Sequence, residues 1–409
     1  MKNYLFVVLF TCVVLPAAWS QHPSKHKGRA IEKKQSRIFT HQVKWEKVSE
    51  GILHTHQADT IVFRAMQGPT DTALYKKIWF NTPALHQNSE YSWAYGAVGM
   101  LESDIYRQHG QKVKLSPMFV VYYDYLLRIQ DFVKTKGNTN LDVASEPNAL
   151  LNVMGTYGIA PLEAYNGLEA KPPLFDSGGM LAALKDFLLT MKNNNNWDME
   201  QVMAVSKDIM NQCMGQPPDS FVYENISYTP QSFLTEYIKI IPNDYYSFMS
   251  VATEKFNQKG ELLEPDNWWH SKNYYNVCVI DFLKVAADAI SAGYPVCING
   301  DFRCANQDTV SRVLAVSQRE MPAQYINDSW RGQRWSFVTT NANAYGNHCA
   351  QIVGYYLLEN KYWFLINDQQ TKSNPSGLWF MSQDFLKFKI SSILLYKYGA
   401  KQVLDKIIK

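Results

Sequence analysis

The sequence predicts an α+β fold, with a mainly helical first part and a β-rich second part, on three observations. From Ser92 onward, apolar residues recur at helical spacing until Gly110 ends the run. Ser116 and Pro117 provide a helix start before residues 118–137. Residues 348–368 contain two β-prone runs around a polar turn at 359–361, which is typical of a hairpin. A helical lobe followed by an antiparallel β lobe places a cleft between them.

The remaining segments also predict mostly helices in the first part of the chain and strands in the second. Residues 146–161 and 178–192 have helical patterns, and residues 281–293 form a helix that Gly293 ends. The run "YPVCING" then predicts a strand, and residues 376–397 predict one or two more. We therefore expect a mainly helical lobe over residues 61–245 and a β-rich lobe over residues 246–409.

The N-terminus has the pattern of a secretory leader. Lys2 precedes the apolar run "YLFVVLFTCVVLPAAW", and Ala18-Trp19-Ser20 offers a small-x-small cleavage site. The sequence predicts a signal peptide over residues 1–20 and a polar N-terminal arm over residues 21–60. The protein is then secreted or periplasmic, and because the apolar run is short for a membrane span, we expect no membrane anchor.

The charge composition limits the classes of partner that the protein is expected to bind. The 409 residues include 40 basic and 37 acidic side chains, for a net charge of +3, which gives no reason to expect a nucleic-acid partner.

Removal of the leader leaves five cysteines, so at least one thiol stays free. Cys297 and Cys304 are one conceivable pair, but the sequence does not fix the connectivity.

Two residues occupy places suited to nucleophilic catalysis. Ser92 begins a helix, where the helix dipole favours a nucleophile, and His348 leads into a distant strand from which it can act as a base. The return strand of the predicted hairpin brings Asn367 and Asp368 back beside His348, where either side chain can fix the imidazole tautomer.

Several segments together resemble a known family. "TPALHQNSEYSWAYGAVGMLES" is similar to the segment around the catalytic Cys of papain-like cysteine peptidases. "YGIAPLEAYNG", "NDYYSFMSV", "PDNWW" and "GNHCAQIVGYY" further resemble the aminopeptidase C and bleomycin hydrolase branch. The resemblance implies a papain-like fold, a Cys-His-Asn triad, an oxyanion-stabilising Gln, and neither a metal nor an organic cofactor. It also implies a peptide or protein ligand in the cleft, and it allows a homo-oligomer.

The resemblance assigns positions in the catalytic site. Ser92 falls on the nucleophile, His348 on the base and Gln87 near the oxyanion Gln. For the residue that orients the His, strand phase favours Asp368, whereas side-chain identity and the spacing to "GLW" favour Asn367; both stay open. The tail "KYGAKQVLDKIIK" resembles the C-terminal arm that lies in the cleft of aminopeptidase C relatives, and a plain terminal helix is the alternative.

The departures from the family pattern bear on activity. A serine hydroxyl is too weak an acid to form the thiolate–imidazolium pair on which thiol peptidases depend. His86 stands six residues before Ser92, where the family has its Gln, and bulky Glu90 and Tyr91 replace small residues. The family's Asn-Ser-Trp-Gly run is "NDQQ" here, without the Trp that shields the His.

Three hypotheses follow. The changes favour a pseudopeptidase that binds peptides or a partner protein in the cleft. The first alternative is an active (amino)peptidase that uses Ser92 or a rebuilt site, with Asp368 completing a Ser-His-Asp set. The second is a structural role as an assembly unit.

Overall fold

The structure is a computed structural model that describes residues 68–82, 91–142, 144–167, 177–302, 312–316, 321–329, 331, 347–368 and 374–408. These residues all lie in the second of two units of the chain, Arg64–Lys409. The predicted signal peptide, the N-terminal arm and Gln87 lie outside the described residues. So does Cys304, the partner considered for Cys297.

Five long helices dominate the described chain between residues 92 and 214. They are α2 (Ser92–His109), α3 (Pro117–Lys134), α4 (Ala149–Tyr157), α5 (Ser177–Asn193) and α6 (Met199–Met214). The first four confirm the helices predicted from apolar spacing. The fifth, α6, was not predicted, although Asp198 caps its start by accepting a hydrogen bond from the Gln201 N–H.

The predicted helix ends are partly right. Gly110 closes α2 in the left-handed region, at φ 70°, as a glycine C-cap does. The hydroxyl of Ser116 accepts the N–H of Phe119 at 3.0 Å and so caps α3. However, α3 ends at Lys134, and Gly137 lies in the turn that follows, at φ 82°.

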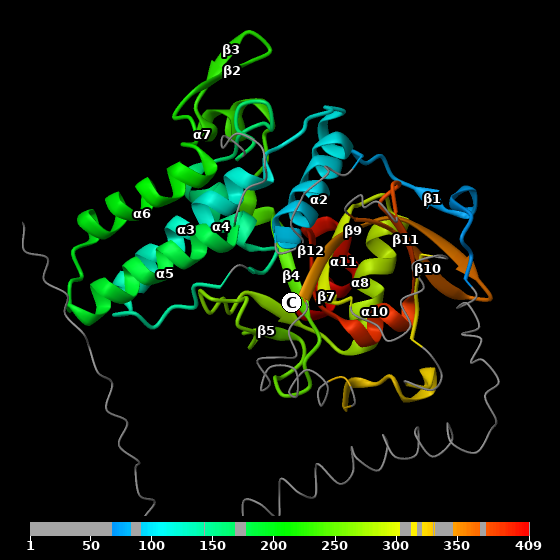
Figure 1. Ribbon diagram of the computed structural model, residues 1–409. Coiled ribbons are helices and arrows are strands. Elements are labelled where there is room, and N and C mark those ends of the chain that lie inside the picture. The colour runs from blue at the N-terminus through cyan, green and yellow to red at the C-terminus, as the bar shows by residue number, and fades with distance from the viewer. Residues whose placement is uncertain are drawn as a thin grey trace, which may run out of the picture. The chain divides into compact units, whose positions relative to one another are not determined.

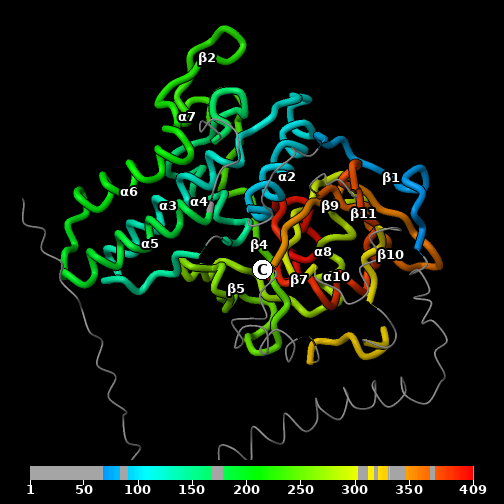
Figure 2. The backbone as a smooth tube through the Cα atoms, viewed as in Figure 1, coloured from blue at the N-terminus to red at the C-terminus, as the bar shows by residue number. Residues whose placement is uncertain are grey.

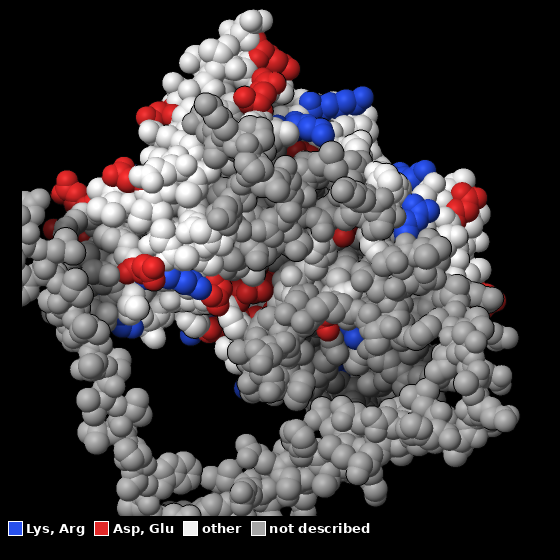
Figure 3. Space-filling model, viewed as in Figure 1, with Lys and Arg blue, Asp and Glu red and all other residues white. Residues whose placement is uncertain are grey.

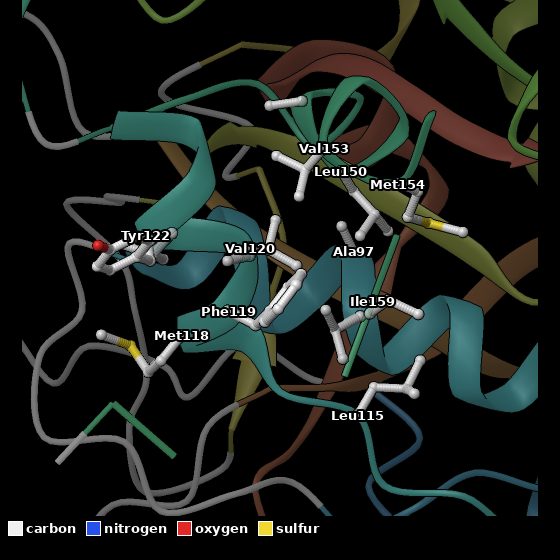
Figure 4. Packing of buried hydrophobic residues seen from close by; sticks show 14 of the residues in the cluster. Ala97, Leu115, Met118, Phe119, Val120, Tyr122, Leu150, Val153, Met154 and Ile159 are labelled. Atoms are coloured by element: carbon white, nitrogen blue, oxygen red, sulfur yellow. The ribbon is translucent and has the colours of Figure 1, made fainter. Parts of the chain in front are cut away.

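The core of this helical part is continuous and apolar. Figure 4 shows Ala97 of α2, Phe119 of α3 and Leu150 of α4 pointing toward one another, and all three are fully buried. Helix α2 packs against the other helices of this core and also against the sheet. Close packing on both sides holds the helix that begins at Ser92 in place.

The second part is built on a mixed, mostly antiparallel sheet, to which ten described strands contribute. Their order is β5-β6-β4-β12-β7-β9-β10-β11-β8, with β1 also paired to β9. The strands are β1 (Lys76–Lys77), β4 (Tyr245–Met249), β5 (Gln258–Gly260), β6 (Tyr274–Asn276), β7 (Val296–Asp301), β8 (Val313–Leu314), β9 (Asn347–Leu358), β10 (Lys361–Asn367), β11 (Leu378–Ser382) and β12 (Ile390–Tyr396).

Strands β9 and β10 form the predicted hairpin. Glu359 and Asn360 make its two-residue turn, with φ values of 51° and 60°, which match the right-handed twist of the strands. The pairing register shifts between Leu365 and Ile366, where the strands are irregular. Residues 376–397 hold the two expected strands, β11 and β12, but also a helix that was not predicted, α10 (Gln383–Lys389).

The sheet separates two layers of helices. Cys297 and Cys349 face the core that contains α2, whereas their neighbours Val296 and Ala350 face a second core. That second core contains α8 (Val279–Ser291), α10 and α11 (Lys401–Ile407). Figure 1 shows α2 beside β9, and α8, α10 and α11 gathered in yellow and red near strands β7, β9 and β12.

The C-terminal residues form a helix on this outer layer. Val403 and Leu404 of α11 are buried in the second core, and Lys406 pairs with Asp281 of α8 at 2.6 Å. The residues up to Ile408 therefore form a terminal helix that packs in the second core, and Lys409 lies outside the described residues. Figure 2 shows the same course of the backbone.

Shorter elements complete the fold. They are η1 (Thr72–Leu74), the hairpin β2 (Phe221–Tyr223) and β3 (Ile226–Tyr228), α7 (Pro230–Ser232), η3 (Phe233–Tyr237), η4 (Pro242–Asp244), η5 (Ala323–Tyr325) and η7 (Lys397–Ala400). Among the described helices, none combines the length and apolar character needed to cross a membrane. On the face in Figure 3, the described acidic and basic side chains are interspersed.

Candidate active site

Ser92 lies where helix α2 meets strand β9. It is the first residue of α2 and only 4% exposed, and its Oγ accepts a hydrogen bond from the Cys349 N–H at 3.3 Å. The close approach depends on Gly96, one helical turn later, because a Cβ there would lie 2.5 Å from Cys349 Sγ. Helix packing therefore holds Ser92 against the backbone of the strand that begins with Asn347 and His348.

His348 is paired with Asp368. Its Nε2 lies 2.8 Å from Asp368 Oδ1, and the two side chains are 16% and 13% exposed. The ring of Phe302 packs against the imidazole edge to face, with ring centroids 5.2 Å apart. With Nε2 engaged by the carboxylate, Nδ1 is the ring nitrogen left to exchange a proton with a neighbouring group.

The carboxylate controls the charge of this histidine. Burial alone lowers the pKa of His348, but the negative charge and the hydrogen bond of Asp368 together outweigh burial. The pKa of His348 therefore lies above its ordinary value of 6.5.

The two candidates for the orienting residue have different partners. Asn367 donates through Nδ2 to the Asn81 carbonyl at 3.3 Å, and its buried Oδ1 has no hydrogen-bond partner among the described residues. Asp368, the next residue, reaches the imidazole. The structure thus brings Asp368, and not Asn367, to His348.

The loop before Ser92 is described only at its end. Gln87, His86 and Glu90 lie outside the described residues, so the structure gives no geometry for an oxyanion donor from this loop. Tyr91, which stands where the family has a small residue, is buried at the N-cap of α2 and makes no side-chain capping bond there.

A cavity with both apolar and polar lining residues adjoins Ser92 between α2 and the β9–β10 hairpin. It measures about 60 Å³, and Ser92 and Asp368 both line it. Two further lining residues, Gln351 and Asn367, each hold a buried oxygen that has no described hydrogen-bond partner. Unpaired acceptors at a cavity wall favour an occupant that donates hydrogen bonds.

Glu102 lies at the same cavity, ten residues after Ser92 on the same helix. Its carboxylate accepts hydrogen bonds from Asn81 Nδ2 and the Leu115 N–H, both at 2.7 Å. Burial nevertheless raises the pKa of Glu102 to about 7. Sequence reasoning missed this residue, because ten residues at 3.6 per turn leave its side chain roughly 80° around the helix from Ser92, so helical spacing alone does not align the two.

Cys349 offers no substitute for the missing thiol nucleophile. It is buried, its Sγ lies 3.1 Å from Cys297 Sγ, and burial raises its pKa well above the ordinary value. A thiol in that state is protonated and a poor nucleophile.

Comparison with known proteins identifies the fold. No protein-family model matches the sequence, and no curated protein matches it. PepW from Lactobacillus rhamnosis HN001 is similar in structure, with a TM-score of 0.62 and 14% identity over 94% of this chain and 95% of that one. Digestive procathepsin L 3 of Tenebrio molitor gives a TM-score of 0.35 and 13% identity, over 90% of this chain and 93% of that one. Bromelain from Ananas comosus gives a TM-score of 0.34 and 10% identity, over 78% of this chain and 97% of that one.

The PepW match covers nearly the whole of both chains. It confirms the predicted class, an α+β fold of the papain-like kind. At 14% identity the likeness establishes the fold and leaves the chemistry to the residues of the site.

Proposed function

We propose that this chain is a peptidase homologue that binds a peptide or a partner protein beside Ser92 without hydrolysing it. The observation that carries the proposal is the identity and setting of Ser92. The residue that begins α2 is an alcohol, it is almost fully buried, and its oxygen accepts the Cys349 N–H. The thiolate chemistry of papain-like peptidases is not available to a hydroxyl.

The cavity beside Ser92 supports ligand binding. The unpaired oxygens of Gln351 and Asn367 are buried acceptors, and the N–H groups of a peptide or of an ordered water satisfy such atoms. A ligand that supplies donors there gains hydrogen bonds without displacing an existing partner. We therefore place one end of the bound ligand in this cavity.

A second candidate function rests on the pairing of His348 with Asp368. A carboxylate that orients a histidine near a serine is the arrangement that serine hydrolases use. In that case His348 takes the proton of Ser92 as general base, and the chain is an active (amino)peptidase. Labelling of Ser92 by a serine-directed fluorophosphonate probe supports this candidate, and absence of labelling supports the first.

We also propose that the chain belongs to the aminopeptidase C and bleomycin hydrolase branch and is exported. The segments that resemble this branch and the leader pattern of residues 1–20 support these two statements. N-terminal sequencing of the protein recovered from the exporting cell tests the second. Export with cleavage predicts a first residue near Gln21, whereas an intact Met1 contradicts it.

Retention of peptides tests the principal proposal. The purified chain is dialysed against a mixed peptide library, and bound and free peptides are compared by mass spectrometry. We expect a subset of peptides to be enriched and intact. Substituting both Gln351→Met and Asn367→Leu is expected to reduce that enrichment, whereas the control Ser206→Ala, a buried serine of α6 outside the cavity, leaves it unchanged.

Two outcomes contradict the proposal. If no peptide is retained by the unchanged chain, the binding function is wrong and a structural role gains support. If cleaved products accumulate and depend on Ser92, the protein is a working hydrolase.

A further inference from the structure

Three carboxyl groups that do not belong to the cavity beside Ser92 meet inside the protein. Glu146, Glu264 and Asp266 each offer an oxygen, and these oxygens lie within 4.8 Å of one another. All three residues are buried, at 0%, 5% and 7% exposure. The residues come from two distant segments, one just before α4 and the other between β5 and β6.

The sheet supplies the surroundings of this carboxylate cluster, which consists of Glu146, Glu264 and Asp266. Asn299 of β7 donates to Glu146 Oε1 at 2.9 Å, and Ser392 of β12 donates to Glu146 Oε2 at 2.7 Å. Each carboxylate oxygen has two lone pairs, so acceptor capacity remains after these bonds.

A second observation points to a missing partner. Oε1 of Glu264 is fully buried and has no hydrogen-bond partner among the described residues. The other oxygen of Glu264, Oε2, accepts the amide of Asn347 at 2.5 Å. A buried carboxylate oxygen left without a donor costs free energy, so it indicates a site whose occupant is a cation or a donor.

One basic side chain close to the cluster is already bound elsewhere. The guanidinium of Arg128 acts on Asp266, but it is paired with Asp124 and bound to the carbonyls of Asp142 and Ala144. Three carboxylates whose oxygens lie within 4.8 Å of one another repel one another unless a cation or a proton lies between them.

We propose that Glu146, Glu264 and Asp266 form a binding site for a hard divalent cation of the calcium class. Carboxylate oxygens are the ligands that such ions prefer, and calcium tolerates the irregular geometry of oxygens from separate segments. A cation between the three oxygens neutralises them together and occupies the free oxygen of Glu264. A shared proton is the competing arrangement.

Asn347 connects this site with the candidate active site. Its amide reaches both Glu264 and Asp266, at 2.5 and 3.2 Å, and it directly precedes His348 in β9. The occupied site holds the two carboxylates to which Asn347 is bound, and thereby fixes the start of the strand that carries His348. Asn347 is in this respect a positioning residue.

Metal binding is measured directly on the purified chain after dialysis against EDTA. Terbium is added as the probe, because its emission is sensitised by a nearby aromatic ring. The Tyr274 hydroxyl donates to Asn148 Oδ1 at 3.0 Å, two residues along the chain from Glu146. We expect sensitised emission that calcium chloride displaces. At about 100-fold excess over its Kd, calcium is expected to raise the unfolding temperature by roughly 3–4 °C, relative to sodium chloride of equal ionic strength.

Two variants and a control test whether the cluster residues bind the metal. Glu264→Gln and Glu146→Gln retain the size of the carboxyl group but remove its charge, and each is expected to lose the emission and the calcium-dependent stabilisation. Glu261→Gln is the matched control, because this nearby carboxylate pairs with His270 at 2.8 Å and lies outside the cluster. It is expected to behave as the unchanged chain.

The competing arrangement makes opposite predictions. If the cluster holds only protons, the unchanged chain shows neither emission nor stabilisation by calcium or magnesium, and glutamine is tolerated as a mimic of a protonated carboxyl. Either that result or emission that persists in both glutamine variants overturns the proposal. Should a variant fail to fold, the titration of the unchanged chain decides alone.

Discussion

Asp368 and His348 are joined by a 2.8 Å contact between Oδ1 and Nε2, whereas Asn367, one residue earlier, is turned toward the Asn81 carbonyl. The carboxylate therefore sets the charge and tautomer of the imidazole. The pair thus places a negative charge where the resemblance to papain-like peptidases implies a neutral amide.

Removal of the Asp368 charge is expected to lower the pKa of His348. The carboxylate favours the imidazolium, so Asp368→Asn leaves burial as the dominant influence, and burial lowers the pKa of a histidine. An NMR titration of the His348 ring measures the change. Asn367→Ala is the control and is expected to leave the His348 pKa nearly unchanged; the opposite ranking of the two variants would show that Asn367 orients the ring.

Glu102 is expected to make stability fall as the pH rises from about 4.5 to 7. Its ordinary pKa is 4.5 and burial raises it to about 7, so in this window the folded state binds more protons than the unfolded state. The contribution of the protonated Glu102 to the free energy of unfolding is fully present below pH 4.5 and is lost as the pH rises through 7. The free energy of unfolding falls by no more than about 1.4 kcal/mol per pH unit from this one group.

Urea unfolding at several pH values measures this dependence. Glu102→Gln is expected to reduce the slope by the share of this one group, because glutamine does not titrate. Glu163→Gln, at an exposed position, is the matched control and is expected to retain the slope. A slope that is identical in all three proteins would contradict the assignment of Glu102.

Gly96 is expected to tolerate no larger residue. A Cβ at this position would lie 2.5 Å from Cys349 Sγ and 3.0 Å from the Cys349 carbonyl carbon, so Gly96→Ala must push α2 away from β9. Overpacking of this kind costs about 1–3 kcal/mol in the free energy of unfolding. Gly155→Ala in α4 is the control, since a Cβ there meets no atom within 4 Å and alanine favours a helix.

Chemical denaturation of the two alanine variants provides the comparison. The expected result is destabilisation by Gly96→Ala and unchanged or higher stability for Gly155→Ala. Equal stability of both variants would mean that the contact between α2 and β9 is looser than the structure describes.

Much of the fold can be predicted from local sequence patterns, and the elements that were not predicted have local causes. Apolar spacing and the Ser116 cap predict the helices of the first part, and the Glu359-Asn360 turn predicts the β9–β10 hairpin. Helix α10 was missed because its residues are also β-prone, although the Ser382 hydroxyl caps it by accepting the Phe385 N–H at 3.2 Å.

The candidate site could be predicted only in part. Ser92 and His348 stand in recognisable sequence contexts, but the choice between Asn367 and Asp368 depends on side-chain direction at the end of β10, beyond an irregular register at Leu365 and Ile366. The carboxylate cluster was missed because Glu146 and Glu264 are far apart in the sequence and only the folded chain brings them together.

Turnover of fluorogenic aminoacyl and short peptide substrates by the unchanged chain, compared with Ser92→Ala, tests the central claim most directly. We expect both proteins to show the same background, because the hydroxyl of Ser92 performs no hydrolysis. Turnover by the unchanged chain that disappears in Ser92→Ala would contradict the claim and make Ser92 a working nucleophile.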